Sequence, residues 1–326
     1  MKVNIKDIEL IAELENTHDR EIPTPSAIVK CLDEYVIDQE DAKKALALMY
    51  VNHLAKLQNN LSTLKTMDIG SNVLLLTGPS GSGKTHLIRA LSKITELPIQ
   101  IEDASQFTSA GYVGRNAQDM LLSLIQRADN DIQLAQKGII FIDEIDKIAS
   151  SYTTAEVRGI SIQIEMLKII EGTRINIEAD QKSSMRGVKD LQFDTSNILF
   201  ILGGAFAQLT DTTGTALGFS EQDTMTERVL KPKDILKFGF IKEFVGRITQ
   251  ISAVTKLSKE ALRRVFTEPK DALLKQYECL FDIRGIKYKI TEEDIDHIVD
   301  EADKLAIGAR SLKQVADTFL RDKTFN

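Results

Sequence analysis

The sequence predicts an α/β fold in which a large domain, built on a parallel sheet flanked by helices, is followed by a small, mainly helical α+β domain. An apolar run at 73–77 leads into a glycine-rich loop and then into residues with helical spacing. A second apolar run, at 139–142, ends in two carboxylates. Continuous apolar runs of this length are typical of strands buried on both faces of a parallel sheet. Beyond residue 248 the pattern becomes mainly helical.

Length and composition set the domain organisation. The chain has 326 residues, of which 43% are hydrophobic and 27% are charged, as in an ordinary globular protein. This length favours one large and one small domain over a single core. We expect a helical extension at 1–22, the large domain at 23–248 and the small domain at 249–326.

Charge and cysteine content argue against several classes of protein. The net charge is −7, and Lys and Arg are spread along the chain, which disfavours a nucleic-acid partner. Cys31 and Cys279 are too few and too far apart for a zinc site or a disulfide framework, so we expect a cytoplasmic protein. No apolar run approaches membrane-spanning length, and no signal peptide is recognisable.

The glycine-rich loop has the pattern of a phosphate-binding P-loop. It consists of Gly78, Pro79, Ser80, Gly81, Ser82, Gly83, Lys84 and Thr85. Its glycines let backbone N–H groups surround a phosphate, and the following helix adds the partial positive charge of its N-terminus. Lys84 is expected to reach the β and γ phosphates, and the Thr85 hydroxyl to ligate Mg²⁺.

The carboxylates after the second apolar run are candidates for catalysis. Asp143 would hold Mg²⁺ through its water shell, together with Thr85 and the phosphates. Glu144 would accept a proton from the water that attacks the γ phosphate. An acidic pair also occurs as an ordinary strand end, but an intact P-loop upstream favours the catalytic interpretation.

The sequence favours ATP over GTP as the nucleotide. A guanine-specific switch would need an Asn/Thr-Lys-x-Asp segment, and the chain contains no Lys-x-Asp. Val36 and Ile37 precede the P-loop strand, so they are either core residues or contacts for the adenine.

A short loop between glycines, at 111–114, carries Tyr112 and Val113. An aromatic and a branched side chain at the tip of a mobile loop could grip a polypeptide of any sequence, because a ring face accepts most side chains. A buried hairpin is the alternative interpretation, because aromatic residues are usually buried.

These motifs, with the segments 32–40, 198–206 and 238–247, resemble the ClpX family of AAA+ unfoldases over residues 23–326. The resemblance implies an AAA+ large domain with a small lid domain, and a homohexameric ring that hydrolyses ATP. It further implies that the ring pulls tagged or unfolded proteins through its pore and delivers them to the ClpP peptidase. A remodelling or assembly factor that works without a peptidase is the alternative.

The resemblance also assigns roles to single residues. Tyr112 and Val113 match the pore loop that grips substrate, and Asp143 with Glu144 matches the Walker B motif. Arg247 matches the arginine finger offered to a neighbouring subunit, where a fixed guanidinium stabilises charge on the transferred phosphoryl group. Arg310 matches the sensor-2 arginine of the small domain. An ordinary surface position would explain either arginine equally well without the family context.

A tripeptide matches the family's peptidase-docking loop. It consists of Leu217, Gly218 and Phe219, within a polar stretch that favours an exposed loop. HslU, a related family, lacks this tripeptide and carries an inserted domain for which this chain has no room.

Several positions depart from the family pattern. The sequence has no cysteine cluster for the family's N-terminal zinc-binding domain, and 173–191 lacks the Arg-Lys-His triplet that reads degradation tags. Asp38 stands where glycine is usual, but Asp tolerates a left-handed backbone better than most residues. Arg115 replaces a typical acid and is expected to reverse the charge near the channel mouth.

In the small domain, helical patterns at 257–280 and 291–306 flank an expected strand at 286–290. Thr291 and Asp294 have the spacing of a capping box, which would start the second of these helices.

Overall fold

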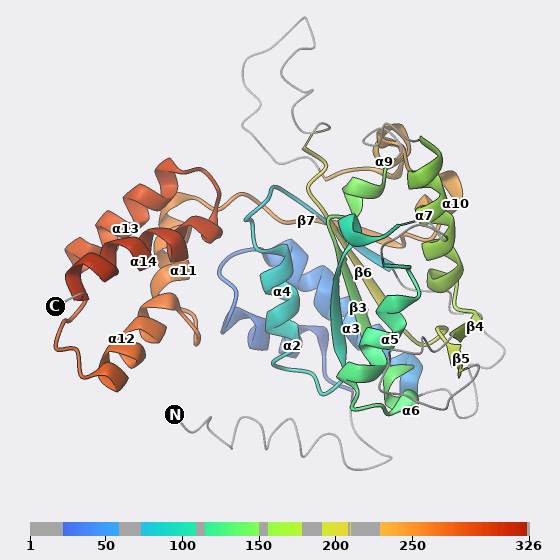
Figure 1. The fold of residues 1–326 in the computed structure, drawn as a ribbon, viewed down its shortest axis with the longest axis horizontal. Coiled ribbons are helices and arrows are strands. Elements are labelled where there is room, and N and C mark those ends of the chain that lie inside the picture. The colour runs from blue at the N-terminus through green and yellow to red at the C-terminus, as the bar shows by residue number, and fades with distance from the viewer. Residues whose placement is uncertain are drawn as a thin grey trace, which may run out of the picture.

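The structure is a computed structural model that describes residues 22–58, 73–108, 115–149, 156–177, 191–207, 209 and 229–324. These residues form two lobes joined by an extended segment, with the small lobe beside α2 and α4 (Figure 1). Within the described ranges, no helix is long and apolar enough to cross a membrane. The predicted helical extension at 1–22 falls almost entirely outside the described residues.

The large lobe contains a five-stranded, all-parallel sheet in the order β2-β3-β6-β1-β7. Its strands are β1 (Val73–Thr77), β2 (Ile99–Asp103), β3 (Ile139–Asp143), β6 (Leu199–Gly204) and β7 (Gln250–Ala253). A separate antiparallel hairpin pairs β4 (Arg174–Ile177) with β5 (Leu191–Asp194). The parallel order brings the carboxyl ends of β1 and β3 to one edge, on either side of β6.

The sheet is buried on both faces, as its apolar strands predict. Along β1, Val73 and Leu75 pack into the core on one face, whereas Leu74 and Leu76 pack into the core on the other. All four side chains are at most 1% exposed. Period-two alternation distributes a continuous apolar run over two cores, which fixes the register of β1.

Helices cover both faces of the sheet (Figure 1). One face is covered by α2 (Pro25–Asp33), α3 (Glu40–Gln58) and α4 (Lys84–Leu91). The other is covered mainly by α5 (Asp119–Arg127), α7 (Glu156–Ile170), α9 (Pro232–Phe238) and α10 (Lys242–Val245). Shorter elements are η3 (Ala104–Gln106), α6 (Ile132–Ala135) and η4 (Ile145–Ile148).

Four helices with their own apolar core make up the small lobe. They are α11 (Lys259–Thr267), α12 (Leu273–Arg284), α13 (Glu292–Lys304) and α14 (Ala309–Thr324). The predicted capping box is present, because the Thr291 side chain accepts from the Asp294 N–H and Asp294 accepts from the Thr291 N–H.

The expected strand at 286–290 is wrong: this segment has no strand structure. Within the described part of the small lobe there is no strand for it to pair with, and Ile290 is instead buried against the helices. The expected boundary at 248/249 also falls too early, because β7 pairs with β1 in the large-lobe sheet. We therefore place the division between Ala253 and Leu257, where the small-lobe core begins.

Candidate active site

The P-loop lies between the carboxyl end of β1 and the start of α4. Gly83 adopts φ +109° immediately before α4, where a residue with a side chain would be strained. Lys84 Nζ donates to the carbonyl oxygens of Gly78 at 2.6 Å and Pro79 at 3.0 Å. Burial lowers the pKa of Lys84, against the opposing effect of the Asp143 charge. The loop thus holds a buried ammonium group at the N-terminus of α4.

Two glycines of the loop allow the backbone of other segments to come close. A Cβ on Gly78 would lie 2.1 Å from the Val254 carbonyl oxygen, in the segment after β7. A Cβ on Gly81, where φ is +79°, would lie 2.0 Å from the carbonyl oxygen of Ile307 in the small lobe. These glycines therefore bring the P-loop against both the connecting segment and the small lobe, a role that the sequence pattern did not predict.

The predicted Mg²⁺ ligands meet at the edge of the sheet. Thr85 Oγ1 donates a hydrogen bond to Asp143 Oδ2, joining the start of α4 to the end of β3. A Cβ on Gly203 of β6 would lie 2.7 Å from the Phe141 ring and 3.1 Å from Asp143 Oδ1, so glycine at that position gives both side chains room. Glu144 follows with φ +55° and is exposed, and its N–H donates to Asp143 Oδ1 at 2.9 Å.

A hydroxyl and a carboxylate fit Mg²⁺, which prefers oxygen ligands and usually retains waters and substrate phosphates in its coordination sphere. Within the described ranges, no group of three or more His, Cys, Asp or Glu side chains could hold a metal by itself. The residues present therefore fit a cation that is held largely through a nucleotide.

A cleft of about 620 Å³ lies between the two lobes and contains these groups. Val36 and Ile37, the candidate adenine contacts, line it with apolar side chains of the small lobe such as Leu257 and Leu273. Both are nearly buried, at 5% and 7% exposure. These two residues are therefore buried and also line the cleft.

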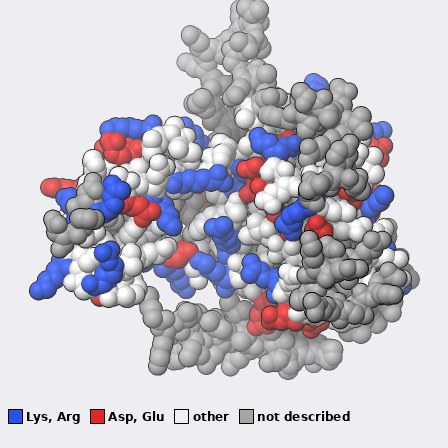
Figure 2. Space-filling view, viewed as in Figure 1, with Lys and Arg blue, Asp and Glu red and all other residues white. Residues whose placement is uncertain are grey.

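The cleft is electrostatically suited to an anion. Lys and Arg side chains gather between the lobes in Figure 2, although the chain as a whole carries a net charge of −7. The basic side chains that line the cleft are Lys84, Arg89, Lys93, Lys147, Arg310 and Lys313. They outnumber the acidic side chains in its lining. A local excess of positive charge between low-dielectric walls concentrates anionic ligands.

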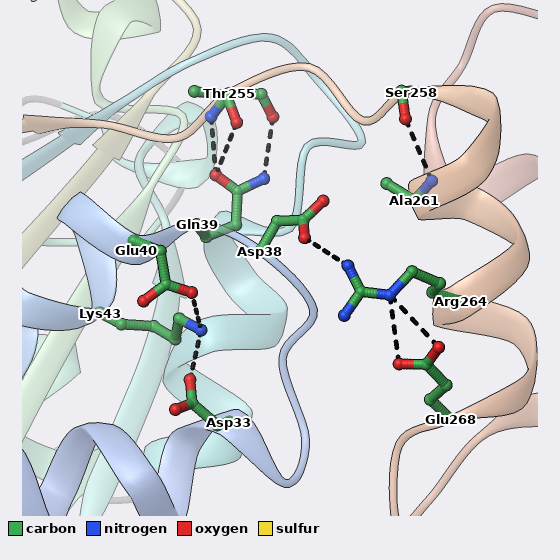
Figure 3. Close-up of polar contacts among 10 residues, drawn as sticks. All are labelled: Asp33, Asp38, Gln39, Glu40, Lys43, Thr255, Ser258, Ala261, Arg264 and Glu268. Atoms are coloured by element: carbon green, nitrogen blue, oxygen red, sulfur yellow. Dashed lines mark hydrogen bonds and ion pairs between the residues drawn. The ribbon is translucent and has the colours of Figure 1, made fainter.

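Gln39 joins the P-loop to the segment between the lobes, a role that sequence reasoning missed. Its Nε2 donates to the carbonyl oxygens of Ser82 at 3.3 Å and Thr255 at 2.9 Å. Its Oε1 accepts from the Thr255 N–H at 2.7 Å (Figure 3). The side chain is 6% exposed, and a buried amide with satisfied donors and acceptors fixes its neighbours firmly.

The left-handed turn expected at Asp38 is present, with φ +55°. Its carboxylate accepts from Arg264 Nη1 of α11 at 2.8 Å, so the residue also contacts the small lobe (Figure 3). The only feature of the sequence that pointed to the contact between Asp38 and Arg264 was the charged residue at a position where the family usually has glycine.

Arg310 lies at the start of α14 and faces the P-loop. Its Nη1 donates to Ser80 Oγ at 3.3 Å, and the neighbouring Ala309 N–H donates to the Gly81 carbonyl oxygen at 3.1 Å. The small lobe therefore presents both a guanidinium and a helix N-terminus to the phosphate-binding loop.

Other predicted site residues lie outside the cleft or outside the described residues. Arg247 follows α10, is 45% exposed and pairs with Glu171 at 2.5 Å. The structure thus does not bring it to the cleft of its own chain. Tyr112 and Val113 fall outside the described residues. So does the tripeptide Leu217, Gly218 and Phe219.

The expected charge reversal at Arg115 needs correction. Its guanidinium makes two hydrogen bonds to the buried carboxylate of Glu102, so its positive charge is neutralised. The acid that compensates it lies 13 positions earlier in the sequence, and only the fold brings the two together.

Comparisons with known proteins identify the family. The family model described as "AAA domain (Cdc48 subfamily)" matches residues 71–251, and "C-terminal, D2-small domain, of ClpB protein" matches 257–325. Proteins from two strains of Porphyromonas gingivalis, each named "ATP-dependent Clp protease ATP-binding subunit ClpX", are 36% identical over 329 aligned positions. The alignments cover 96% of this chain and 80% of each relative. The chain is an AAA+ ATPase and belongs to the ClpX family.

Proposed function

We propose that this chain is an ATP-driven protein unfoldase that acts as a homohexameric ring and delivers unfolded protein to a ClpP-like peptidase. The proposal rests on the family and on one observation above all, the contact of Thr85 with Asp143 beside Glu144 in a positively charged cleft between two lobes. A cytoplasmic location remains part of the proposal, as do unfolded or tagged proteins as substrates.

Residues of the P-loop would bind the nucleotide phosphates through backbone N–H groups and the Lys84 ammonium group. Thr85 and Asp143 would hold Mg²⁺, which when bound supplies charge neutralisation on the phosphates. Val36 and Ile37 would contact the adenine from the large lobe. The small lobe would close over the nucleotide as a lid and present Arg310 to the phosphates.

Glu144 would act as general base and take a proton from the attacking water at its carboxylate. Its exposed position at the end of β3 leaves the side chain accessible to water in the cleft. Arg247 would act in the cleft of a neighbouring subunit, and its exposure and distance from its own cleft support this assignment. Glu171 would orient the guanidinium before the subunits meet.

Tyr112 and Val113 would grip the substrate in the pore, and the tripeptide Leu217, Gly218 and Phe219 would dock the peptidase. Both assignments rest on the match of these residues to the family's motifs.

Degradation of an unfolded reporter protein, with a ClpP peptidase added or omitted, and unfolding of a folded reporter together test the proposal. We expect ATP-dependent degradation only with the peptidase, loss of degradation in Phe219→Ala, and loss of unfolding with retained ATP hydrolysis in Tyr112→Ala. Unfolding of a folded reporter that proceeds equally in wild type and Phe219→Ala, with no degradation in either, would instead identify a peptidase-independent remodeller. If the wild type hydrolyses ATP but unfolds no reporter, the proposed function is wrong.

A further inference from the structure

An ion pair with a buried carboxylate joins the end of β2 to the residue that follows the predicted pore loop. Glu102 is only 3% exposed. Arg115 Nη1 donates to its Oε2 at 2.6 Å, and Arg115 Nη2 donates to its Oε1 at 3.2 Å. A second donation from Nη2 reaches Ser123 Oγ of α5 at 2.9 Å. Two parallel hydrogen bonds to a carboxylate fix the orientation of a guanidinium as well as its position.

The backbone closes the same segment at its base. Phe107 forms a β-bridge with Arg115, and the Thr108 N–H donates to the Arg115 carbonyl oxygen at 2.9 Å. Phe107 is 2% exposed and packs into the core of the large lobe. The residues that flank the segment 109–114 are therefore joined by backbone contacts, and the ion pair attaches this base to β2.

The ion pair lies next to the candidate active site. Asp103, adjacent to Glu102, is paired in register with Asp143 on the neighbouring strand. A cavity of about 300 Å³ is lined by Glu102 and Arg115 together with Asp143 and Glu144. The base of the segment and the carboxylates of β3 thus share one cavity at the carboxyl edge of the sheet.

We propose that Glu102 and Arg115 form a clamp, a pair of positioning residues that holds the base of the predicted pore loop, at Thr108 and Arg115, against β2 beside the nucleotide site. The clamp would transmit a displacement at the sheet edge to this base. The inference rests on the proposed role of that loop. It also explains the charge reversal at Arg115, because Glu102 supplies the opposite charge in a buried position.

A volume-matched double variant, Glu102→Met/Arg115→Met, removes the clamp without leaving an unpaired buried charge, which is what makes single removals disruptive. The matched control is Lys259→Met/Asp300→Met, which removes an exposed ion pair within the small lobe. Each assembled protein would be assayed for melting temperature, basal ATP hydrolysis, reporter unfolding and chymotryptic cleavage after Tyr112. Cleavage reports on the restraint of the loop and does not depend on unfolding activity.

We expect the clamp variant to keep its melting temperature within a few degrees and its basal ATP hydrolysis within about twofold of wild type. Cleavage after Tyr112 should be faster and reporter unfolding slower, each by about tenfold, since the base of the loop is no longer held against β2. The control should match wild type in all four assays. Arg115→Lys, which keeps the charge but loses the bidentate geometry, should show about threefold changes in the same directions.

Wild-type cleavage and unfolding rates in a folded clamp variant would overturn the proposal. If the double variant does not fold, Arg115→Lys decides, since unchanged cleavage after Tyr112 in that variant also overturns it. If the wild-type chain unfolds no reporter, the proposed function fails, whereas the cleavage assay still tests the clamp independently.

Discussion

The P-loop and the contacts that hold the small lobe differ in burial. Lys84 is 7% exposed and is held within the P-loop by backbone carbonyl groups. Apart from backbone contacts at Gly81 and Glu34, the small lobe is attached through ion pairs between side chains that are a third to a half exposed. These pairs are Arg264 with Asp38, Lys270 with Glu34 and Lys93 with Asp271.

Exposed ion pairs contribute about 0 to 1 kcal/mol each and are screened by salt, whereas buried contacts resist displacement. This difference indicates that the ion-paired side of the small lobe can shift at little cost while the phosphate-binding loop keeps its shape. Gln39 connects the two kinds of region, because its buried amide contacts both the P-loop and the segment between the lobes.

The largest effect should come from Gly81, where the P-loop and the small lobe meet through their backbones. In Gly81→Ala, the new Cβ would collide with the Ile307 carbonyl oxygen, so the lobe or the loop must shift. We expect the rate of ATP hydrolysis to fall by about a hundredfold or more, because a shift of about 1 Å in the position of catalytic groups has an effect of this size. Steady-state hydrolysis with purified protein measures this.

Gly285→Ala is the matched control for that variant. Gly285 has a similar left-handed φ, +68°, but a Cβ there meets nothing within 4 Å. It should lower stability by about 1 kcal/mol and leave hydrolysis near wild type. Equal losses of hydrolysis in the two variants would show that backbone strain, and not the contact between the lobes, is responsible.

Acid should destabilise the large lobe through His53 of α3. Burial lowers the pKa of His53 from its ordinary value of 6.5 to about 4, although its ring also contacts the Lys137 carbonyl oxygen. The neutral form is favoured in the folded state, so stability is full above pH 6.5 and falls as the pH drops toward 4. The loss over this window is about 3 kcal/mol at most.

Denaturant unfolding between pH 7 and 4 measures this loss. His53→Leu should abolish most of the pH dependence of the free energy of unfolding in this window. His297→Leu, at an exposed position of the small lobe, should retain that pH dependence. If the stability of His53→Leu still depends on pH in this window, groups other than His53 are responsible for the loss.

The smallest effect should come from the exposed contact of Asp38 with Arg264. Asp38→Asn keeps a residue that tolerates the left-handed turn but removes the charge. We expect the KM for ATP to change by less than about fivefold, and the change to disappear at high salt. Asp300→Asn, which breaks an exposed pair within the small lobe, should leave KM unchanged. A larger change that is insensitive to salt would mean that the lobe is rigidly held.

Much of the site could be predicted because it is encoded locally. The P-loop occupies consecutive residues, and the apolar run before Asp143 predicted a buried strand. The sheet order then brought Asp143 to Thr85, a contact anticipated from the shared carboxyl edge of parallel strands.

What sequence reasoning missed depends on contacts between distant residues. Gln39 and Thr255 are 216 positions apart, and nothing local indicates that they meet. The segment 286–290 has the composition of a strand but no partner within the described small lobe, so tertiary context overrides its propensity. Nothing local in the sequence indicates that Glu102 lies beside Arg115, so the sequence predicted an uncompensated positive charge at Arg115.

The central claim is that cleavage of ATP at the cleft between the lobes drives protein unfolding, and Glu144→Gln tests it most directly. The variant keeps the P-loop and the Thr85–Asp143 contact, so ATP should bind with near wild-type affinity. Hydrolysis should fall by about a hundredfold or more because the general base is lost, and reporter unfolding should fall with it. Unfolding at the wild-type rate in a variant that binds ATP but does not hydrolyse it would contradict the account.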